Sequence, residues 1–565
     1  MSEIFPSLAS KPKSRWNDSF TDKLWMLAFL FAAVLIFGLN LGGVPLRDWD
    51  EGIVAQVGRE IWGGKLNWLY PTIGTMPYLN KPPLVHWLMG LCFAAGGVSE
   101  FTARLIPAML TAASVPMLYA IGRELFPKRA IAIFSALVYL TLMPVVRHGR
   151  LAMLDGAVLC FLLVAMWCLL RSRRDLRYAL AAGIGFGLIC LTKGVMLGLL
   201  LGAIGFLFLV WDTPRLLTSG YLWGGLAIGT FPVAAWYFAQ WLHYGKDFID
   251  TNLVSQSFRR ISEPVGNHKG PPWYYLLEIL ESAWPWQLFC LQGLRLSWEN
   301  RSFAGPKLIL VWSGFYLLAI SVMNTKLPWY VLPIYPAFAL AVGSYFAEVW
   351  EQMEVPEDPV KDAAKERAEE SFDALSFLPH PAILGLLAVV AAAGCVYFGG
   401  WVRLGGQIAP IERDLQLMLM FVALTMTISA VLLHRKDRQF LLVLIWGTYV
   451  SLLVFVASDR WVWELAEDYP VKPIAEIVRT GTPAGQEVFT SHRLPRPSLN
   501  FYSNRQVIVA DGQTLKQKWQ TLAQPYFLLE KPVLKHLDLQ NAEVVKTADD
   551  WVLVTKKQVN KLSRS

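Results

Sequence analysis

Thirteen apolar runs follow one another between residues 24 and 457, and they constrain the fold more than any other feature of the sequence. A bilayer core of about 30 Å needs roughly 20 helical residues to cross it. Only 17% of the residues are charged, whereas soluble chains usually carry about 25%. We therefore predict a polytopic α-helical membrane protein with spans near 24–44, 102–122, 130–146, 156–170, 178–192, 195–211, 221–242, 273–294, 307–323, 329–349, 381–400, 415–433 and 439–457.

One further apolar stretch, 84–97, is left out of this count. Its length, about 14 residues, is typical of an interfacial or re-entrant segment. The loop charges agree, because lysine and arginine gather on the cytoplasmic side of membrane proteins. With 84–97 left out, the basic clusters near 123–129, 171–177, 215, 295–307, 361–367 and 434–438 fall inside. We expect a cytoplasmic N-terminus and outer loops at 45–101, 147–155 and 243–272.

This topology divides the chain into a cytoplasmic tail at 1–23, a transmembrane domain at 24–457 that includes the outer loop 45–101, and a final part at 458–565. The final part alternates short β-rich runs such as QVIVA and WVLVTK with polar helical stretches. Such alternation is typical of a small α/β domain, which an odd number of spans would place outside, in the periplasm. The charged inner loop 351–380 has the pattern of a solvated helix.

Cysteine spacing and charge exclude three classes of protein. None of the six cysteines belongs to a CxxC pair, which argues against a disulfide framework or a zinc site built from cysteines. The net charge of +8 comes from short basic clusters between apolar runs rather than from a basic stripe. We therefore expect membrane lipids, and no nucleic acid, as partners of these clusters.

The first outer loop begins with Arg47-Asp48-Trp49-Asp50-Glu51, in which three carboxylates stand within four residues. Ionised carboxylates can serve as a general base or bind a hard divalent cation. A solvated interfacial loop is the simpler alternative. A lone acid, Asp155, opens the helix predicted at 156–170 on the same side of the membrane, where it could also be an ordinary N-terminal cap.

Several basic residues stand at the same outer face. Lys81 precedes two prolines that stiffen the chain, and a fixed ammonium near the membrane surface suits a phosphate. A lysine that merely extends to the interface is the alternative. Two more lysines, Lys193 and Lys326, interrupt apolar hairpins, where a charge needs an interface or a partner. The third outer loop adds Arg259 and His268.

Six segments resemble, in order and in spacing, the bacterial PMT-like glycosyltransferases of the GT-C class. That family includes the aminoarabinose lipid A transferases and, more distantly, the protein O-mannosyltransferases. The segments are DEGIVAQVGREI, YLNKPPLVHWL, RLAMLD, LTKG, HKGPPWYYL and NTKLPWYVLPIYPAFAL. The resemblance implies a GT-C fold with thirteen spans, juxtamembrane helices in the first outer loop, a periplasmic α/β domain and a polyprenyl-phosphate sugar donor, commonly undecaprenyl phosphate.

The resemblance also suggests roles for single residues. Asp50 and Glu51 match the acidic pair of the first loop, with Asp50 as the catalytic or metal-linked acid, and Asp155 matches the acid of the second loop. Lys81 matches the lysine that meets the donor phosphate. The remaining substrate-binding candidates are Tyr78, Lys193, Arg259, His268 and Lys326. A divalent metal, either zinc, magnesium or manganese, is the candidate cofactor, held by Asp50 and Asp155.

Two departures from the aminoarabinose transferases leave the sugar open. Ile53-Val54 stand where those enzymes often carry Arg-Tyr, and Asn80 stands where they carry an acid. The expected function is an inverting transfer of a sugar from a polyprenyl phosphate to a lipid, glycan or protein acceptor on the periplasmic face of the bacterial inner membrane, with lipid A modification as the nearest example. A transporter or flippase of lipid-linked sugars is the main alternative, and a non-catalytic scaffold is the other.

Overall fold

The computed structural model describes residues 15–63, 68–264, 268–353, 373–404, 407–408, 411–462 and 471–557. The chain forms two compact units, which we describe separately. The first unit contains residues 1–41, 79–85 and 105–462, and the second contains 42–78, 86–104 and 463–565. Most of the predicted inner loop, from 354 to 372, lies outside the described residues.

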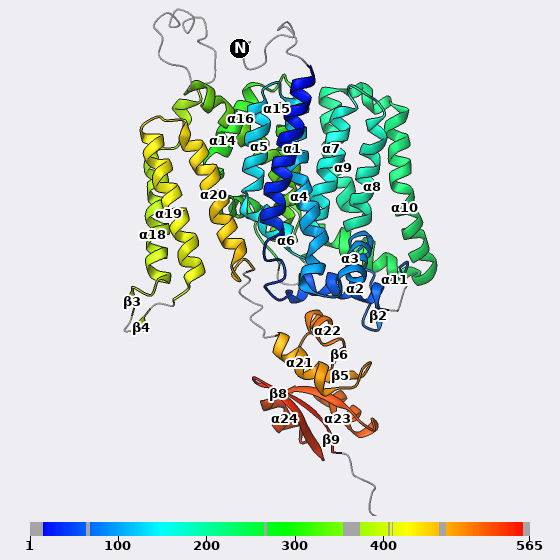
Figure 1. The fold of residues 1–565 in the computed structure, drawn as a ribbon. Helices are drawn as coiled ribbons and strands as arrows, with labels where there is room; N and C mark the ends of the chain where they lie inside the picture. Colours follow the sequence, from blue (N-terminus) through cyan, green and yellow to red (C-terminus); the bar gives the residue numbers. More distant parts are fainter. Residues whose placement is uncertain are drawn as a thin grey trace, which may run out of the picture. The chain divides into compact units, whose positions relative to one another are not determined.

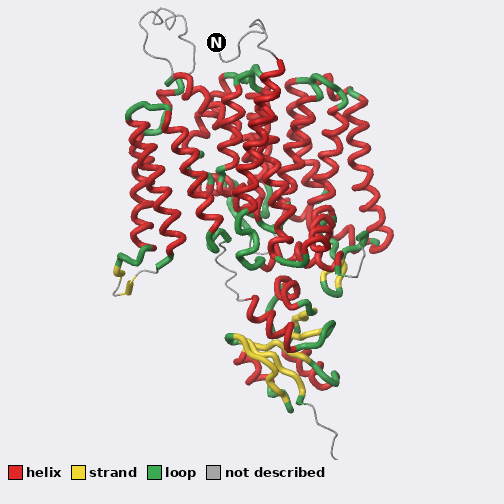
Figure 2. Tube along the Cα trace, in the orientation of Figure 1, coloured by secondary structure: helices red, strands yellow, loops and turns green. Residues whose placement is uncertain are grey.

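The first unit is almost entirely helical (Figures 1 and 2). In the part of the chain that is described, nine helical segments are long and apolar enough to cross a membrane. They are α1 (Arg15–Gly38), α4 (Glu100–Leu125), α9 (Val195–Asp212), α10 (Gly220–Tyr244), α15 (Ala304–Val322), η4 with α16 (Pro328–Ile334 and Tyr335–Gln352), α18 (Pro381–Phe398), α19 (Arg413–His434) and α20 (Gln439–Ala457). Each overlaps a predicted span, although α1 ends at Gly38 where the prediction continued to residue 44.

The other four predicted spans also coincide with helices, but these are shorter or broken. Two are α7 (Asp155–Arg171, 17 residues) and α8 (Tyr178–Lys193, 16 residues). The range 130–146 forms α5 (Arg129–Leu140) and α6 (Met143–Arg150), bent by 57° and together a tenth candidate span. The range 273–294 forms α13 (Tyr274–Ser282) and α14 (Gln287–Glu299). Pro144 and Pro285 stand at these breaks, where proline cannot donate the next helical hydrogen bond.

The apolar stretch 84–97, which was not predicted to span the membrane, forms α3 (Leu84–Gly96), a helix of 13 residues. At 1.5 Å per residue it is about 20 Å long, which is too short for a hydrocarbon core of about 30 Å. Its length therefore favours the predicted topology, in which this segment does not cross.

Glycines allow helices of the first unit to approach closely. Gly183 and Gly187 of α8 face Gly225 and Gly229 of α10, and a Cβ on any of the four would clash with the backbone of the opposite helix. Small residues four apart on both helices are the usual means of such packing in membranes. This close packing against α10 fixes the position of α8, whose last residue is Lys193.

The basic residues predicted on the inner side contact acids between helices. Asp22 of α1 accepts hydrogen bonds from Arg123 (3.1 Å) and Arg129 (2.9 Å). Glu124 at the end of α4 pairs with Arg171 at 2.6 Å. Asp212 at the end of α9 pairs with Lys307 at 3.2 Å. These ion pairs connect the same ends of neighbouring helices, near the N-terminal end of α1 (Figure 1).

The second unit contains an α/β fold built from the C-terminal residues. A five-stranded sheet has the order β6-β5-β7-β9-β8, with β5 parallel to β6 and β7, and β9 antiparallel to β7 and β8. The strands are β5 (Glu487–Thr490), β6 (Gln506–Val509), β7 (Tyr526–Glu530), β8 (Ala542–Ala548) and β9 (Trp551–Lys556). The helices are α21 (Val471–Gly481), α22 (Pro497–Ser503), α23 (Gly512–Thr521) and α24 (Lys531–Leu537).

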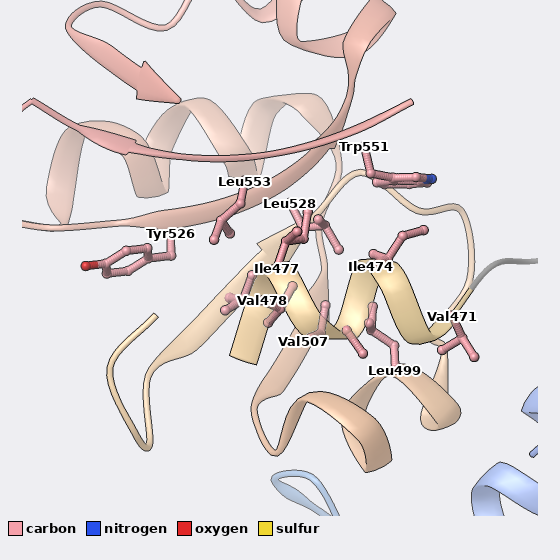
Figure 3. Packing of buried hydrophobic residues seen from close by; sticks show 12 residues of the cluster. Val471, Ile474, Ile477, Val478, Leu499, Val507, Tyr526, Leu528, Trp551 and Leu553 are labelled. Atoms are coloured by element: carbon pink, nitrogen blue, oxygen red, sulfur yellow. The ribbon is translucent and has the colours of Figure 1, made fainter. Parts of the chain in front are cut away.

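The core of this fold lies between α21 and the sheet. Ile474 and Val478 of α21 are fully buried against Val488, Leu528 and Leu553 of the strands (Figure 3). The apolar residues of α21 recur at helical spacing and those of β7 form a continuous buried run, as expected for a helix that covers a sheet.

The second unit also includes most of the first outer loop, which differs from the predicted domain boundary. This loop forms the π-helical turn η1 (Asp48–Gly52), α2 (Ile53–Trp62), a small hairpin of β1 (Thr72–Ile73) and β2 (Met76–Pro77), and most of α3. The Tyr502 hydroxyl of α22 accepts a hydrogen bond from the Leu46 backbone at 2.7 Å. Lys472 of α21 pairs with Glu100 at 2.5 Å. Such contacts, between residues about 400 positions apart, cannot be read from sequence.

Candidate functional site

The first unit contains an open cavity of about 1040 Å³, a volume that includes the open solvent at its mouth. Its charged lining consists of Lys81, Asp155, Lys193 and Arg260. Its polar lining also includes Gln256, Ser257, Tyr316 and Tyr330. The rest of the wall is apolar, formed by Val158, Met196, Leu197, Leu200, Ile261, Ala319, Ile320, Met323, Trp329, Leu332 and Pro333. The cavity thus combines a charged region with a broad apolar surface. We call Lys81, Lys193 and Arg260 the cation cluster.

Lys193 and Asp155 form a close ion pair within the cavity, with Nζ 2.5 Å from Oδ1. Asp155 is the first residue of α7, and Lys193 is the last residue of α8. The following residue, Gly194, has φ +109° and directly precedes α9, and its lack of a side chain allows the chain to turn sharply there. Asp155 and Lys193, which were both predicted at the site, therefore lie together where the start of α7 and the end of α8 adjoin.

Lys81 has no hydrogen bond or ion pair among the described residues, although its side chain is half-buried in the cavity wall. Burial, together with the nearby cations Arg260 and Lys193, lowers its pKa to about 7, and Asp155 opposes this shift. Pro82 and Pro83 follow directly and keep the lysine outside the helix α3. Because the Lys81 ammonium is partly buried and unpaired within the described part of the chain, an anion that enters the cavity would strongly stabilise its charged form.

Arg260, rather than the predicted Arg259, contributes the third cation. Its guanidinium donates to the Tyr330 hydroxyl and to Gln256 Oε1, both at 2.7 Å. The side chain of Arg259 is 61% exposed and lies 3.9 Å from Glu263. The π-helical stretch η3 (Ile249–Phe258) precedes both arginines and shifts the helical phase, so the side that faces the cavity cannot be inferred from a 3.6-residue period.

Lys326 and His268 do not line this cavity. Lys326 is 3% exposed and donates from Nζ to the Ile320 and Ser321 carbonyls, at 3.1 and 2.7 Å. It therefore caps the C-terminal end of α15. His268 is exposed, and its backbone carbonyl accepts a hydrogen bond from the Lys326 amide at 2.9 Å.

The three acids of the first outer loop belong to the second unit and have different partners. Glu51 is fully buried and pairs with both Nε and Nη2 of Arg104 at 2.7 Å. Asp48 accepts a hydrogen bond from the Ser498 backbone at 3.1 Å and pairs with Arg496 at 2.7 Å. The side chain of Asp50 is 21% exposed, against 3% for Asp48 and 0% for Glu51, and pairs with Arg47 at 2.7 Å. Asp50 is thus the most accessible of the three.

Tyr78 also belongs to the second unit. It is 4% exposed and packs with Val57 and Ile61 of α2, and its ring lies edge-on to His86 at 5.3 Å. These contacts indicate a structural role in the first loop.

The metal predicted at Asp50 and Asp155 finds no ready set of ligands. Among the described residues, no group of three or more histidine, cysteine, aspartate and glutamate side chains could hold an ion. Each of the two aspartates is paired with a cation, and the two belong to different units. A hard cation needs several oxygen ligands, so within the described residues these two side chains do not form a complete metal site by themselves.

Three aromatic or amide groups of the cavity were missed by sequence reasoning. The Tyr330 ring lies 5.9 Å from Lys193 Nζ, and its hydroxyl accepts the hydrogen bond from Arg260. Tyr316 donates its hydroxyl to the Tyr330 carbonyl at 2.8 Å. Gln256 holds Arg260. Tyr330 stands in the segment NTKLPWYVLPIYPAFAL, which drew attention to its lysine rather than to its tyrosine.

Comparisons with known proteins show which proteins the chain resembles in sequence and in fold. Residues 80–238, which include Lys81, Asp155 and Lys193, match the family model described as dolichyl-phosphate-mannose-protein mannosyltransferase. A relative from Pseudomonas fluorescens strain Pf0-1, an undecaprenyl phosphate-α-4-amino-4-deoxy-L-arabinose arabinosyl transferase, is 27% identical over 58% of this chain and 60% of its own length. A transferase of the same name from Aeromonas salmonicida is also 27% identical, over 67% of this chain and 71% of its own.

The matched region therefore spans about 60% of the first of these relatives. The crystal structure of ArnT from Cupriavidus metallidurans bound to undecaprenyl phosphate superposes with a TM-score of 0.73 at 17% identity, over 94% of this chain and 98% of that one. The chain is thus a multi-pass helical membrane protein. Its overall fold is that of this ArnT structure, and residues 80–238 resemble the mannosyltransferase family model.

Proposed function

We propose that this protein is an integral membrane glycosyltransferase that takes a sugar from a polyprenyl-phosphate donor of the undecaprenyl type and passes it to a lipid, glycan or protein acceptor. The names of the relatives support this assignment, since they describe transfer from undecaprenyl phosphate. We further propose that the N-terminus is cytoplasmic and that the reaction takes place at the periplasmic face of the inner membrane.

The cavity of the first unit is the observation that carries the proposal. Lys81, Lys193 and Arg260 supply three positive charges against the single acid Asp155. The apolar wall beside them suits an isoprenoid chain, and the surplus of positive charge suits its phosphate. A cavity of this kind recognises both halves of a lipid phosphate at once.

In the proposed mechanism, the bond between the anomeric carbon and the phosphate oxygen breaks, and both electrons leave with the phosphate. The cation cluster stabilises the charge that develops on that oxygen. An acceptor oxygen attacks the anomeric carbon from the opposite side, which inverts its configuration. The acceptor gives up its proton in this step, and we propose Asp50 as the base that takes it or orients the acceptor, because its carboxylate is the most accessible in its loop.

Asp155 and Glu51 serve this reaction indirectly. Asp155 fixes the ammonium of Lys193 through their ion pair. Glu51 holds Arg104 inside the second unit and has no exposed side-chain surface with which to touch a substrate. A divalent metal at Asp50 or Asp155 remains a proposal from sequence, and the mechanism does not depend on it.

A transfer assay tests the proposal directly. The full chain is reconstituted in vesicles with radiolabelled undecaprenyl-phosphate sugars, including 4-amino-4-deoxy-arabinose and neutral sugars, and with lipid A or a peptide as acceptor. Covalent transfer of label is the expected result. Movement of unchanged donor across the bilayer would instead identify a flippase. If neither transfer nor movement is observed, the protein is a non-catalytic scaffold. The Asp50→Ala variant should lose transfer, and full activity in that variant would exclude Asp50 as the catalytic acid.

A further inference from the structure

A buried asparagine outside the cavity wall holds the turn that carries Lys81. Asn252 lies in η3 and is 3% exposed. Its Nδ2 donates to the Leu79 carbonyl at 2.9 Å and to the Asn80 carbonyl at 3.4 Å. These carbonyls belong to the two residues directly before Lys81. The side chain of Asn252 therefore fixes the backbone from which the lysine extends.

The same asparagine is connected to the turn that carries Lys193. The Tyr237 hydroxyl, on α10, donates to Asn252 Oδ1 at 2.9 Å. The Tyr237 oxygen is also hydrogen-bonded to the backbone of Val195, the first residue of α9. Val195 follows Lys193 by two residues. A continuous set of hydrogen bonds thus joins the two lysine-bearing turns, through Tyr237 and Asn252.

We propose that Asn252 and Tyr237 are positioning residues that hold Lys81 and Lys193 at the spacing required for binding the donor phosphate. This inference rests on the proposed function. Neither residue lines the cavity, so neither touches the donor there. Each uses its polar atoms in hydrogen bonds to the other or to backbone, and buried groups of this kind are costly to leave unsatisfied.

Electrostatic repulsion explains why such a restraint is needed. Within the cavity Lys81 faces Lys193 from α8 and Arg260 from α12 (Arg259–Ser262), and Asp155 from α7 is the one acid in the lining. The other titratable side chains of the wall are Tyr316 and Tyr330. Asp155 already pairs with Lys193, so the ammonium groups repel each other before an anion arrives. A turn without its hydrogen bonds would move Lys81 away from the other cations.

The test measures binding of undecaprenyl phosphate, without any sugar, to the full chain in nanodiscs from about pH 6 to about pH 9. Wild type should lose affinity above about pH 7, where free Lys81 loses its proton. Asn252→Leu should weaken binding about tenfold at pH 7 and move the midpoint of the pH profile upward, because a displaced Lys81 regains its ordinary basicity. Tyr237→Phe should shift both quantities in the same direction by a smaller amount, about threefold in affinity.

A double-mutant cycle separates positioning from general stability. In a Lys81→Met background, Asn252→Leu should weaken binding by less than about twofold, since the residue it positions is gone. An equal loss in both backgrounds, or an unchanged midpoint in Asn252→Leu, would overturn the proposal. Tyr237→Phe, which keeps the ring, supplies the same tests if Asn252→Leu does not fold.

Gln287→Leu is the matched control. Gln287 is a buried amide of α14 that donates to the Leu280 carbonyl at 3.1 Å and does not line the cavity. Loss of the Gln287 amide should leave the midpoint of the pH profile of binding unchanged. A shift of that midpoint as large as the one in Asn252→Leu would count against the inference. Failure of wild type to bind undecaprenyl phosphate would refute the proposed function itself, which is a different outcome.

Discussion

At the scale of single residues, Lys81 makes phosphate binding sensitive to pH. Its pKa of about 7 in the free protein means that the ammonium is half deprotonated near neutrality. A bound phosphate raises the pKa again, so binding above pH 7 takes up a proton. We expect the dissociation constant for undecaprenyl phosphate to rise by up to about tenfold per pH unit above 7.

Binding titrations across this pH range check the prediction. Lys81→Met should bind weakly and without the loss of affinity above pH 7, because the ammonium that deprotonates there is absent. A wild-type profile that stays flat to about pH 9 would contradict the assignment of the depressed pKa to the phosphate-binding lysine.

Glu51 offers a second prediction at this scale, for stability rather than catalysis. Glu51→Gln leaves the guanidinium of Arg104 buried without its counter-charge. Breaking a buried pair from one side costs about 3–5 kcal/mol. We expect a clear fall in the melting temperature and faster proteolysis of the first loop.

The exposed pair Arg479–Glu476 serves as the comparison for that measurement. Both side chains are about half exposed, at 53% and 54%. Glu476→Gln should change stability by less than about 1 kcal/mol. If Glu51→Gln abolished sugar transfer but kept the wild-type melting temperature, Glu51 would have the catalytic role that sequence resemblance first suggested.

At the scale of elements, the glycines between α8 and α10 govern the position of Lys193. A Cβ at Gly187 would clash with the Gly229 backbone, and backbone cannot move aside as a flexible side chain can. Gly187→Ala should therefore separate the two helices, cost about 1–3 kcal/mol and reduce transfer activity. Gly314→Ala on α15 is the control, because no atom lies within 4 Å of its added Cβ. Equal melting temperatures for the two variants would contradict this packing role.

The elements also show how far the sequence could predict the site. Lys81, Asp155 and Lys193 were found because each interrupts or borders an apolar run. A charge there is costly unless it has a partner or a function. Arg260 was missed because the resemblance suggested its neighbour Arg259, and the π-helical stretch before the two arginines gives no simple period from which the choice could have been corrected. The Glu51–Arg104 and Asp48–Arg496 pairs join residues 53 and 448 positions apart, and no local pattern reveals such partners.

At the scale of the whole molecule, one helix decides the topology. If α3 does not cross the membrane, the thirteen predicted spans place the loop after α7 inside and the C-terminal α/β fold outside. If α3 crosses, both locations reverse. Among the described residues nine helical segments are long enough to span and α5 with α6 makes ten, so the parity of the full count depends on the shorter helices, α3 among them.

Cysteine labelling distinguishes the two topologies in one experiment. Single cysteines replace Arg174, whose side chain is 65% exposed after α7, and the exposed Thr521 of α23, in a chain whose native cysteines have been replaced. A membrane-impermeant maleimide applied to intact spheroplasts should label Thr521→Cys at once and Arg174→Cys only after permeabilisation. The reverse pattern would mean that α3 spans. In that case Asp155, which follows α3 in the chain, would lie on the cytoplasmic side, and a donor presented at the outer face could not reach the cation cluster.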